Sequence, residues 1–288
     1  MADTRAAPPA PRPFFPGRGP GDPGLAVFLN AGDPGPPERF EELLLRLDGL
    51  GVDCLELAVP FPDSVTDGPV IRRSARRALD RGTDLAAALG MLARVRPWLR
   101  HTRVALLADW RHTVRPAGPE PFMRQVREAG ADAVLVHGAP PLARPRCAEA
   151  AREAGLPTVA TCYASSPPAV REEAARSASA YLYLVAHYGR SGSAAPDPEA
   201  LRPVLAGLAR PGVAPVAVGF GVRTAADVRA MGRLGADAAI VGTALVGRLE
   251  EALLAGRDPV AAAEHFVRDL LRSAAPDAAS PSTNGRNA

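Results

Sequence analysis

The 288-residue sequence contains no lysine, so all 34 of its basic residues are arginine. Schiff-base aldolases and pyridoxal-phosphate enzymes need a lysine amine as the nucleophile, and P-loop proteins need a lysine beside the phosphates. The absence of lysine excludes these three classes. Any carbon–carbon bond chemistry in this chain must therefore use carboxylates, His, Tyr or a metal ion.

Cysteines and long apolar runs are also scarce. Cys54, Cys147 and Cys162 lie far apart without a C-x-x-C pair, so we expect neither a disulfide framework nor a zinc ribbon. No apolar run approaches the roughly 20 residues of a membrane span, and the N-terminus has no apolar signal-peptide core. We therefore expect a cytoplasmic protein without membrane attachment.

The charge balance gives no indication of a nucleic-acid partner. The 34 basic and 31 acidic residues leave a net charge of +3, and the arginines are scattered rather than clustered. Hydrophobic residues make up 47% of the chain but aromatic residues only 5%, so a core must consist mainly of Ala, Val and Leu. This composition is typical of a globular protein.

Both ends of the chain differ in composition from its middle. Residues 1–23 are rich in Pro, Gly and Ala without periodicity and predict a flexible leader, in which Phe14 and Phe15 are the candidates for a short ordered segment. Residues 274–288 predict a disordered tail. Residues 24–273 are left as a single domain.

In that domain, eight short apolar runs alternate with longer amphipathic stretches, which predicts eight βα units. The predicted strands are Gly24–Asn30, Cys54–Pro60, Arg103–Ala108, Asp132–Val136, Pro157–Cys162, Ala180–Val185, Ala214–Val218 and Asp237–Val241. The predicted helices include Glu38–Leu47, Leu85–Trp98, Pro121–Glu128, Arg146–Glu153, Glu199–Leu208 and Ala225–Leu234, several of which end at a glycine suited to a C-cap (Gly130, Gly155 and Gly235).

Strands that are almost continuously apolar favour a parallel sheet covered by helices. A closed (β/α)₈ TIM barrel is the simplest arrangement of eight such units. A doubly wound open sheet is the alternative, but the first strand lacks the G-x-G-x-x-G turn of a dinucleotide site. In a barrel, the functional residues lie at the C-terminal ends of the strands.

Two carboxylates are the candidate catalytic residues. Alternation along the second strand places Glu56 on the barrel interior, where burial would raise its pKa and suit it to proton transfer. Asp67 follows in the next loop, in Asp67-Gly68-Pro69. The alternatives are structural: Glu56 could reach solvent or pair with an arginine at the end of its strand, and Asp67 could serve only to form a turn. The two carboxylates on one βα unit favour the catalytic interpretation.

Glycine-containing turns after the last two strands predict a phosphate site. Gly219–Thr224 and Gly242-Thr243 both precede helices, whose free backbone N–H groups bind anions. The Gly/Ser-rich segment 186–196 is typical of a mobile lid and contains His187, a further catalytic candidate. The remaining histidines are scattered and predict no metal site.

Several of these motifs together closely resemble the tryptophan synthase alpha chain family, in order, over residues 25–271. The motifs are Phe28–Pro34, Leu55–Phe61, Asp67-Gly68-Pro69, Tyr183 with the following Gly189 and Gly192, Gly219-Phe220-Gly221 and Gly242-Thr243. The resemblance implies a lyase of tryptophan biosynthesis that cleaves indole-3-glycerol phosphate to indole and glyceraldehyde 3-phosphate without a metal or cofactor. It also implies a beta chain that docks on the loops after the second and third strands.

The resemblance also implies roles for single residues. Glu56 matches the general acid/base that protonates indole C3, and Asp67 matches the carboxylate that binds the indole N–H. The residues that match the substrate-binding positions are Phe28 and Tyr183 for the site wall and Gly192, Gly221, Gly242 and Thr243 for the phosphate, with Thr243 in place of the usual Ser.

The sequence departs from the family pattern around the aryl pocket and the expected docking surface. The departures are Pro62 and Ser64 in the second loop, Asp109-Trp110-Arg111 in place of Tyr-x-Asn, Gly138 in place of Asp, and His187 in place of Arg. They leave two alternatives open. One is a lyase for a modified aryl glycerol phosphate in a specialised pathway, and the other is a weakly catalytic barrel that binds a phosphate ligand and regulates a partner. They also predict weak binding to a standard beta chain.

Overall fold

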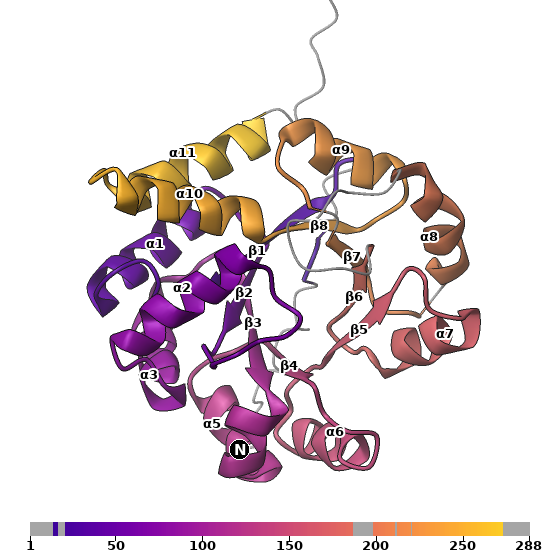
Figure 1. The fold of residues 1–288 in the computed structure, drawn as a ribbon. Coiled ribbons are helices and arrows are strands. Elements are labelled where there is room, and N and C mark those ends of the chain that lie inside the picture. The colour runs from indigo at the N-terminus through magenta and orange to yellow at the C-terminus, as the bar shows by residue number, and fades with distance from the viewer. Residues whose placement is uncertain (1–13, 17–20, 187–197, 211, 220, 273–288) are drawn as a thin grey trace, which may run out of the picture.

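The computed structural model describes residues 14–16, 21–186, 198–210, 212–219 and 221–272, which form a ring of helices around a parallel β-barrel (Figure 1). All eight predicted strands are confirmed, with ends that shift by one or two residues. The strands are β1 (Gly24–Asn30), β2 (Cys54–Ala58), β3 (Arg103–Asp109), β4 (Ala133–His137), β5 (Val159–Tyr163), β6 (Tyr181–Val185), β7 (Val216–Gly219) and β8 (Ala238–Val241).

The barrel is closed at its weakest seam by a single bridge. The hydrogen-bonded strand order is β4-β3-β2-β1-β8-β7-β6-β5, with parallel pairs throughout. Between β4 and β5 only Val134 and Thr158 form a bridge, and Val134 N donates to Pro157 O at 2.9 Å. The (β/α)₈ barrel is therefore confirmed and the open-sheet alternative is wrong.

Helices cover the outside of every strand. They are α1 (Pro37–Gly49), α2 (Pro69–Asp80), α3 (Leu85–Val95), α4 (Arg115–Ala117), α5 (Pro119–Glu128), α6 (Arg144–Glu153), α7 (Pro168–Ser177), α8 (Arg202–Leu208), α9 (Ala225–Arg233), α10 (Thr243–Leu254) and α11 (Pro259–Arg272). The predicted C-cap glycines Gly130, Gly155 and Gly235 all have positive φ angles, as the helix ends require. No helix among the described residues is long and apolar enough to cross a membrane.

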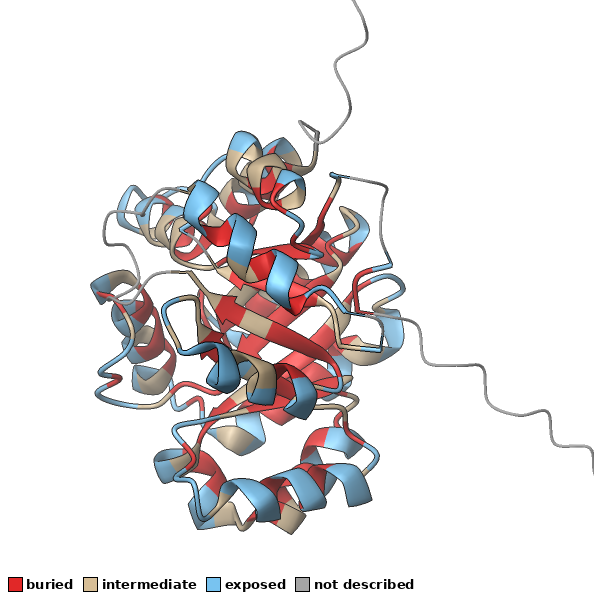
Figure 2. Ribbon diagram, turned by 90° about the vertical axis from the view of Figure 1, so that its right-hand side faces the viewer, coloured by how far each residue is buried: buried red, intermediate tan, exposed pale blue. Residues whose placement is uncertain are grey.

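The strands are mostly buried within the ring of helices (Figure 2), and alternation along them separates two apolar layers. Large side chains such as Leu55 and Leu57 point outward and pack under the helices, for example against Phe40 of α1. Small side chains such as Cys54 and Ala105 point into the barrel. The small inward residues leave room for a few large or polar side chains, which form the candidate site.

Phe14 and Phe15 belong to the barrel interior, although they lie within the predicted leader. They are 8% and 7% exposed, and both rings lie 5.4 Å from the ring of Tyr181. Gly24 makes room for this packing, because a Cβ there would lie 2.8 Å from Phe15 Cδ1. The two phenylalanines therefore fill the barrel below Tyr181, while residues 1–13 and 17–20 lie outside the described residues.

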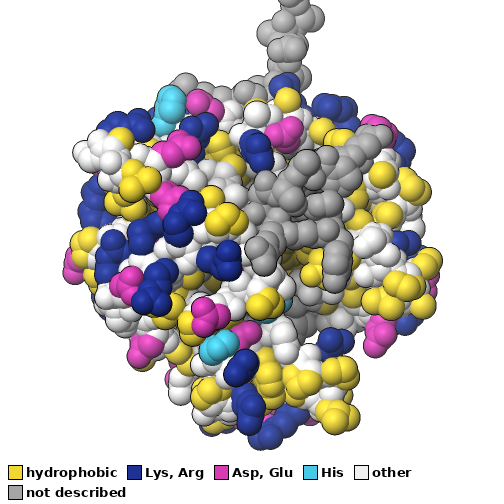
Figure 3. Space-filling view, viewed as in Figure 1, with side chains coloured by type: hydrophobic (Ala, Val, Ile, Leu, Met, Phe, Trp, Pro, Cys, Tyr) yellow, Lys and Arg dark blue, Asp and Glu magenta, His cyan; other side chains and the backbone are white. Residues whose placement is uncertain are grey.

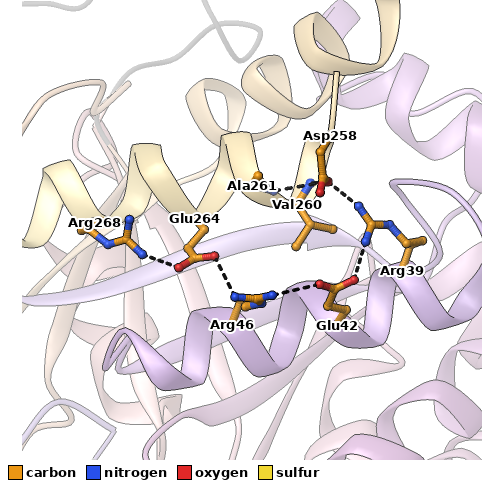
Figure 4. Close-up of polar contacts among 8 residues, drawn as sticks. All are labelled: Arg39, Glu42, Arg46, Asp258, Val260, Ala261, Glu264 and Arg268. Carbon is orange, nitrogen blue, oxygen red and sulfur yellow. Dashed lines mark hydrogen bonds and ion pairs between the residues drawn. The ribbon is translucent and has the colours of Figure 1, made fainter. Parts of the chain in front are cut away.

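Two ion-pair networks tie the helix ring together, and they differ in burial. Arg77 of α2 donates to both oxygens of Asp33, at 2.9 and 2.7 Å, and to Glu250 of α10 at 2.7 Å. Asp33 is only 1% exposed. The second network joins α1 to α11 on the surface (Figure 4); its charged members are Arg39, Glu42, Arg46, Asp258, Glu264 and Arg268.

We expect Arg77→Ala to lower the free energy of unfolding by about 2 to 3 kcal/mol, because it leaves the buried Asp33 carboxylate without its main partner. The matched control is Arg46→Ala, which removes an arginine whose side chain is 54% exposed. Its effect should stay within about 0.5 kcal/mol. Urea unfolding of both variants tests the difference, and equal effects would contradict this assignment of the two networks.

Candidate active site

A cavity of about 290 Å³ opens at the C-terminal ends of the strands. This size lies near the lower end of the range for small-molecule sites. All but one of the strand residues that line it occupy inward positions; the exception is Ala108, and the others are Phe28, Asn30, Ala58, Leu107, Asp109, Leu135, His137, Thr161, Tyr163, Tyr183, Val185, Gly219 and Ile240. The loops add residues that include Asp67, Gly221, Arg223, Gly242 and Thr243. Every predicted site residue among the described residues lines the cavity except Glu56.

Glu56 lies within the barrel, below the cavity. It is fully buried and points inward as alternation predicts, with Phe28 and Ala105 as its register partners on β1 and β3. The Tyr181 hydroxyl donates to Glu56 Oε1 at 2.7 Å. Glu56 Oε2 is buried and has no hydrogen-bond partner among the described residues. One carboxylate oxygen is therefore held, while the other is desolvated.

Desolvation raises the pKa of Glu56 from its usual 4.5 to about 7, although the Tyr181 hydrogen bond acts in the opposite direction. A carboxyl group with this pKa is protonated in about half of the molecules at neutral pH. It can donate a proton and take one back under the same conditions, which suits it to general acid–base catalysis.

Asp67 lies at the rim of the cavity in the loop between β2 and α2, and is half-buried. The buried Ser64 hydroxyl donates to Asp67 Oδ2 at 2.6 Å, and Asp67 N donates back to Ser64 Oγ at 3.3 Å. Ser64 therefore fixes the position of the Asp67 carboxylate. This contact gives a structural reason for the serine at a position where the sequence departs from the family pattern.

Tyr183 and Phe28 form apolar walls of the cavity. Burial is the largest cause of a raised pKa at Tyr183, and the nearby carboxylates of Glu56 and Asp67 raise it further, so its hydroxyl stays protonated. Gly219 is required beside this ring, because a Cβ there would lie 2.6 Å from Tyr183 Cε2. Tyr183 therefore lies close to both candidate catalytic carboxylates.

The opposite end of the cavity is lined by the predicted phosphate residues. Gly221, with a φ of +67°, follows β7, and Gly242 is the N-cap residue of α10, with Thr243 next to it. Gly192 and His187 lie outside the described residues. Arg223, to which the sequence analysis assigns no role, also lines this end of the cavity and forms no ion pair with the other described residues. The signal available in the sequence was that Arg223 is a basic residue within the glycine-containing turn Gly219–Thr224.

The other side of the cavity is more polar than the sequence predicts. Asp109 is among the residues that the sequence places around the aryl pocket and the expected docking surface; it is only 8% exposed and lines the cavity at the end of β3, which extends one residue further than predicted. The placement of Asp109 at the pocket is therefore confirmed, and its placement on an exposed docking surface is wrong. Within the described part of the chain, no three His, Cys, Asp or Glu side chains form a metal-ligating cluster.

Comparison with known proteins agrees with this geometry. A sequence profile described as "Tryptophan synthase alpha chain" matches residues 18–275. The chain is 36% identical over 258 residues to the tryptophan synthase alpha chain of Burkholderia thailandensis, covering 90% of this chain and 93% of that protein. It is also 36% identical over 247 residues to that of Burkholderia multivorans, covering 86% and 89%.

Solved structures give the same result. The tryptophan synthase subunit alpha of Legionella pneumophila superposes with a TM-score of 0.77 at 27% identity, covering 88% of this chain and 92% of that chain. A mutant alpha-subunit from Pyrococcus furiosus gives a TM-score of 0.78 at 29% identity, covering 87% and 98%. The chain therefore belongs to the tryptophan synthase alpha chain family.

Proposed function

We propose that this chain is a lyase that cleaves indole-3-glycerol phosphate to indole and glyceraldehyde 3-phosphate. The observation that carries the proposal is a fully buried Glu56 with a pKa of about 7, placed below a cavity that has Asp67 at its rim. A barrel that only regulates a partner has no need of a desolvated carboxylate, which costs free energy to bury.

Each carboxylate has one task in the proposed reaction. The protonated Glu56 rotates away from Tyr181 and donates its proton to indole C3, while Asp67 accepts a hydrogen bond from the ring N–H and stabilises the positive charge on the ring. The Glu56 carboxylate then takes the proton of the glyceryl hydroxyl next to C3. The carbon–carbon bond breaks, its electron pair returns to the ring, and Glu56 is again protonated.

The phosphate end holds the substrate in place during these steps. Gly221, Gly242 and Thr243 line this end of the cavity, and Gly242 is the N-cap residue of α10, where free backbone N–H groups stabilise an anion. We assign Arg223 to the same phosphate, because its side chain lines this end of the cavity. Gly192 is proposed to complete the site on the basis of the family resemblance.

Incubation of the purified chain with indole-3-glycerol phosphate tests the proposal. We expect indole and glyceraldehyde 3-phosphate in equal amounts. A chain that binds glycerol phosphate but releases no indole would instead favour the regulatory barrel.

We propose a beta chain as a weak partner. The resemblance places it over the loops after β2 and β3, where Pro62 and Arg111 are exposed. An arginine without a matching charge opposes association. We also propose a cytoplasmic location, in which the buried free thiols of Cys54, Cys147 and Cys162 stay reduced.

We therefore expect measurable lyase activity without a beta chain, and little binding to a beta chain from an unrelated species. Calorimetry with that beta chain and with the organism's own measures the difference. Arg111→Asn should improve binding to the unrelated chain. Tight binding of the unmodified protein to it, with strong activation of indole release, would contradict this prediction.

A further inference from the structure

A carboxylate other than those of Glu56 and Asp67 lines the cavity, and the proposed reaction does not use it. Asp109 occupies the last inward position of β3, in line with Ala105 and Leu107, and is 8% exposed. Its register partner on β4 is His137, which also lines the cavity. The proposed phosphate residues follow β7 and β8, several strands away from β3 in the sheet order, so Asp109 lies across the cavity from them.

The carboxylate of Asp109 is held in one orientation. The backbone N and ring Nδ1 of His112 both donate to Asp109 Oδ1, at 2.8 and 2.7 Å. The His112 ring in turn stacks on Phe61, with ring centroids 5.4 Å apart and planes inclined by 20°. Oδ1 is therefore occupied, and Oδ2 is left as the oxygen available to a ligand.

The surroundings of Oδ2 leave room for such a ligand. A Cβ on Gly138 would lie 3.4 Å from Asp109 Oδ2, so the glycine keeps this side of the carboxylate open. Oδ2 accepts no hydrogen bond from the other described residues, and the adjacent cavity wall is formed by the side chains of Leu107, Leu135 and His137. The site therefore presents a carboxylate oxygen as a hydrogen-bond acceptor beside the aliphatic side chains of Leu107 and Leu135.

An unsubstituted indole ring cannot donate a hydrogen bond to both the Asp67 carboxylate and Asp109 Oδ2. It carries a single N–H donor, which the proposed reaction assigns to Asp67. Its benzene carbons would displace water from Asp109 Oδ2 without replacing the lost hydrogen bonds, which opposes binding. A hydroxyl or amino group on the ring would restore a hydrogen bond at that position. Sites built to bind a donor select strongly against analogues that lack it.

We propose that the preferred substrate is an indolyl glycerol phosphate whose benzene ring carries a hydroxyl or amino group that donates to Asp109 Oδ2. This inference rests on the proposed lyase function. It assigns Asp109 as a specificity-determining residue, with His112 as the residue that positions it.

The test compares kcat/KM for indole release from indole-3-glycerol phosphate with that from its ring-hydroxylated and ring-aminated analogues, substituted in turn at each free carbon of the benzene ring. We expect one hydroxyl and one amino position to be preferred at least about tenfold over the unsubstituted substrate, as a hydrogen bond to a charged group allows. Asp109→Asn keeps an oxygen for His112 and replaces Oδ2 by an NH₂ group. The preference for the amino analogue should then disappear, while a hydroxyl, which also accepts, keeps part of its advantage.

The matched control is Asp63→Asn, which removes a carboxylate of the same rim that is exposed and does not line the cavity. Asp63→Asn should leave the kcat/KM of every analogue, relative to that of the unsubstituted substrate, unchanged. Cleavage of the unsubstituted substrate at least as fast as of every analogue, with ratios insensitive to Asp109→Asn, would overturn this inference and leave the lyase function intact. Cleavage of none of the substrates would overturn the proposed function itself.

Discussion

Glu56→Gln is expected to lower the rate of indole release at least about a thousandfold, the loss typical of a removed general acid–base group. The amide is nearly isosteric and still accepts from the Tyr181 hydroxyl, which binds Oε1 at 2.7 Å in the unmodified protein. The affinity for glycerol phosphate should change less than about twofold, since the phosphate residues are untouched. The two measurements are indole release and calorimetric titration.

The same variant has a second expected effect, on stability. The pKa of Glu56 is raised from its usual 4.5 to about 7 on folding. The folded state therefore binds more protons than the unfolded chain between these values, and stability falls as pH rises through this window. The loss is complete above about pH 7 and is on the order of 3 kcal/mol. A glutamine at position 56 is neutral at every pH, so the variant does not lose this stability as the pH rises.

Glu56→Gln should therefore be more stable than the unmodified protein at about pH 8.5 and lose much of that advantage at about pH 5. Urea unfolding at both pH values tests this. A glutamine variant that releases indole at the normal rate would contradict the proposed reaction. An unchanged stability difference between the two pH values would contradict the desolvation of Glu56.

Gly242→Asp is expected to weaken glycerol phosphate binding at least about a hundredfold, because it places a negative charge where the phosphate is proposed to lie. Gly242 is the N-cap residue of α10 and lines the cavity. Aspartate is a favourable N-cap residue, so the variant should stay folded. Calorimetry measures the affinity, and circular dichroism checks the fold.

Two further variants separate charge from size at this site. Gly242→Ala adds a Cβ 3.4 Å from Phe28 Cβ, a tight contact without charge, and should cost much less affinity. Arg223→Gln should weaken binding about tenfold, as the loss of one partly exposed charged contact does. Normal binding of glycerol phosphate to folded Gly242→Asp would show that the phosphate lies elsewhere.

The sequence predicts the barrel well because its signals are local. Each strand is an apolar run of a few residues, and several helices end at a glycine that adopts a positive φ, as at Gly130. Alternation also predicts correctly that Glu56 faces the interior. The secondary structure of a residue, and the side of the sheet that its side chain faces, both follow from its neighbours in the chain. Predicting them therefore needs no long-range information.

The contacts that tune the site are not predictable in this way. Tyr181 is 125 residues away from Glu56, and alternation places both inside without showing that they meet. Phe14 and Phe15 lie in a segment whose composition predicts flexibility, yet barrel closure leaves a space that they fill. Asp109 lies one residue beyond the predicted end of β3, so the sequence does not decide between the aryl pocket and the docking surface.

The dependence of the rate of indole release on pH tests the central claim most directly. The purified chain, saturated with substrate, is assayed from mildly acidic to mildly alkaline pH. If Glu56 is the proton donor to the ring, kcat falls as pH rises through about 7, because its carboxyl group loses the proton that the first step requires. A kcat that stays constant or rises through neutral pH would contradict this role of Glu56.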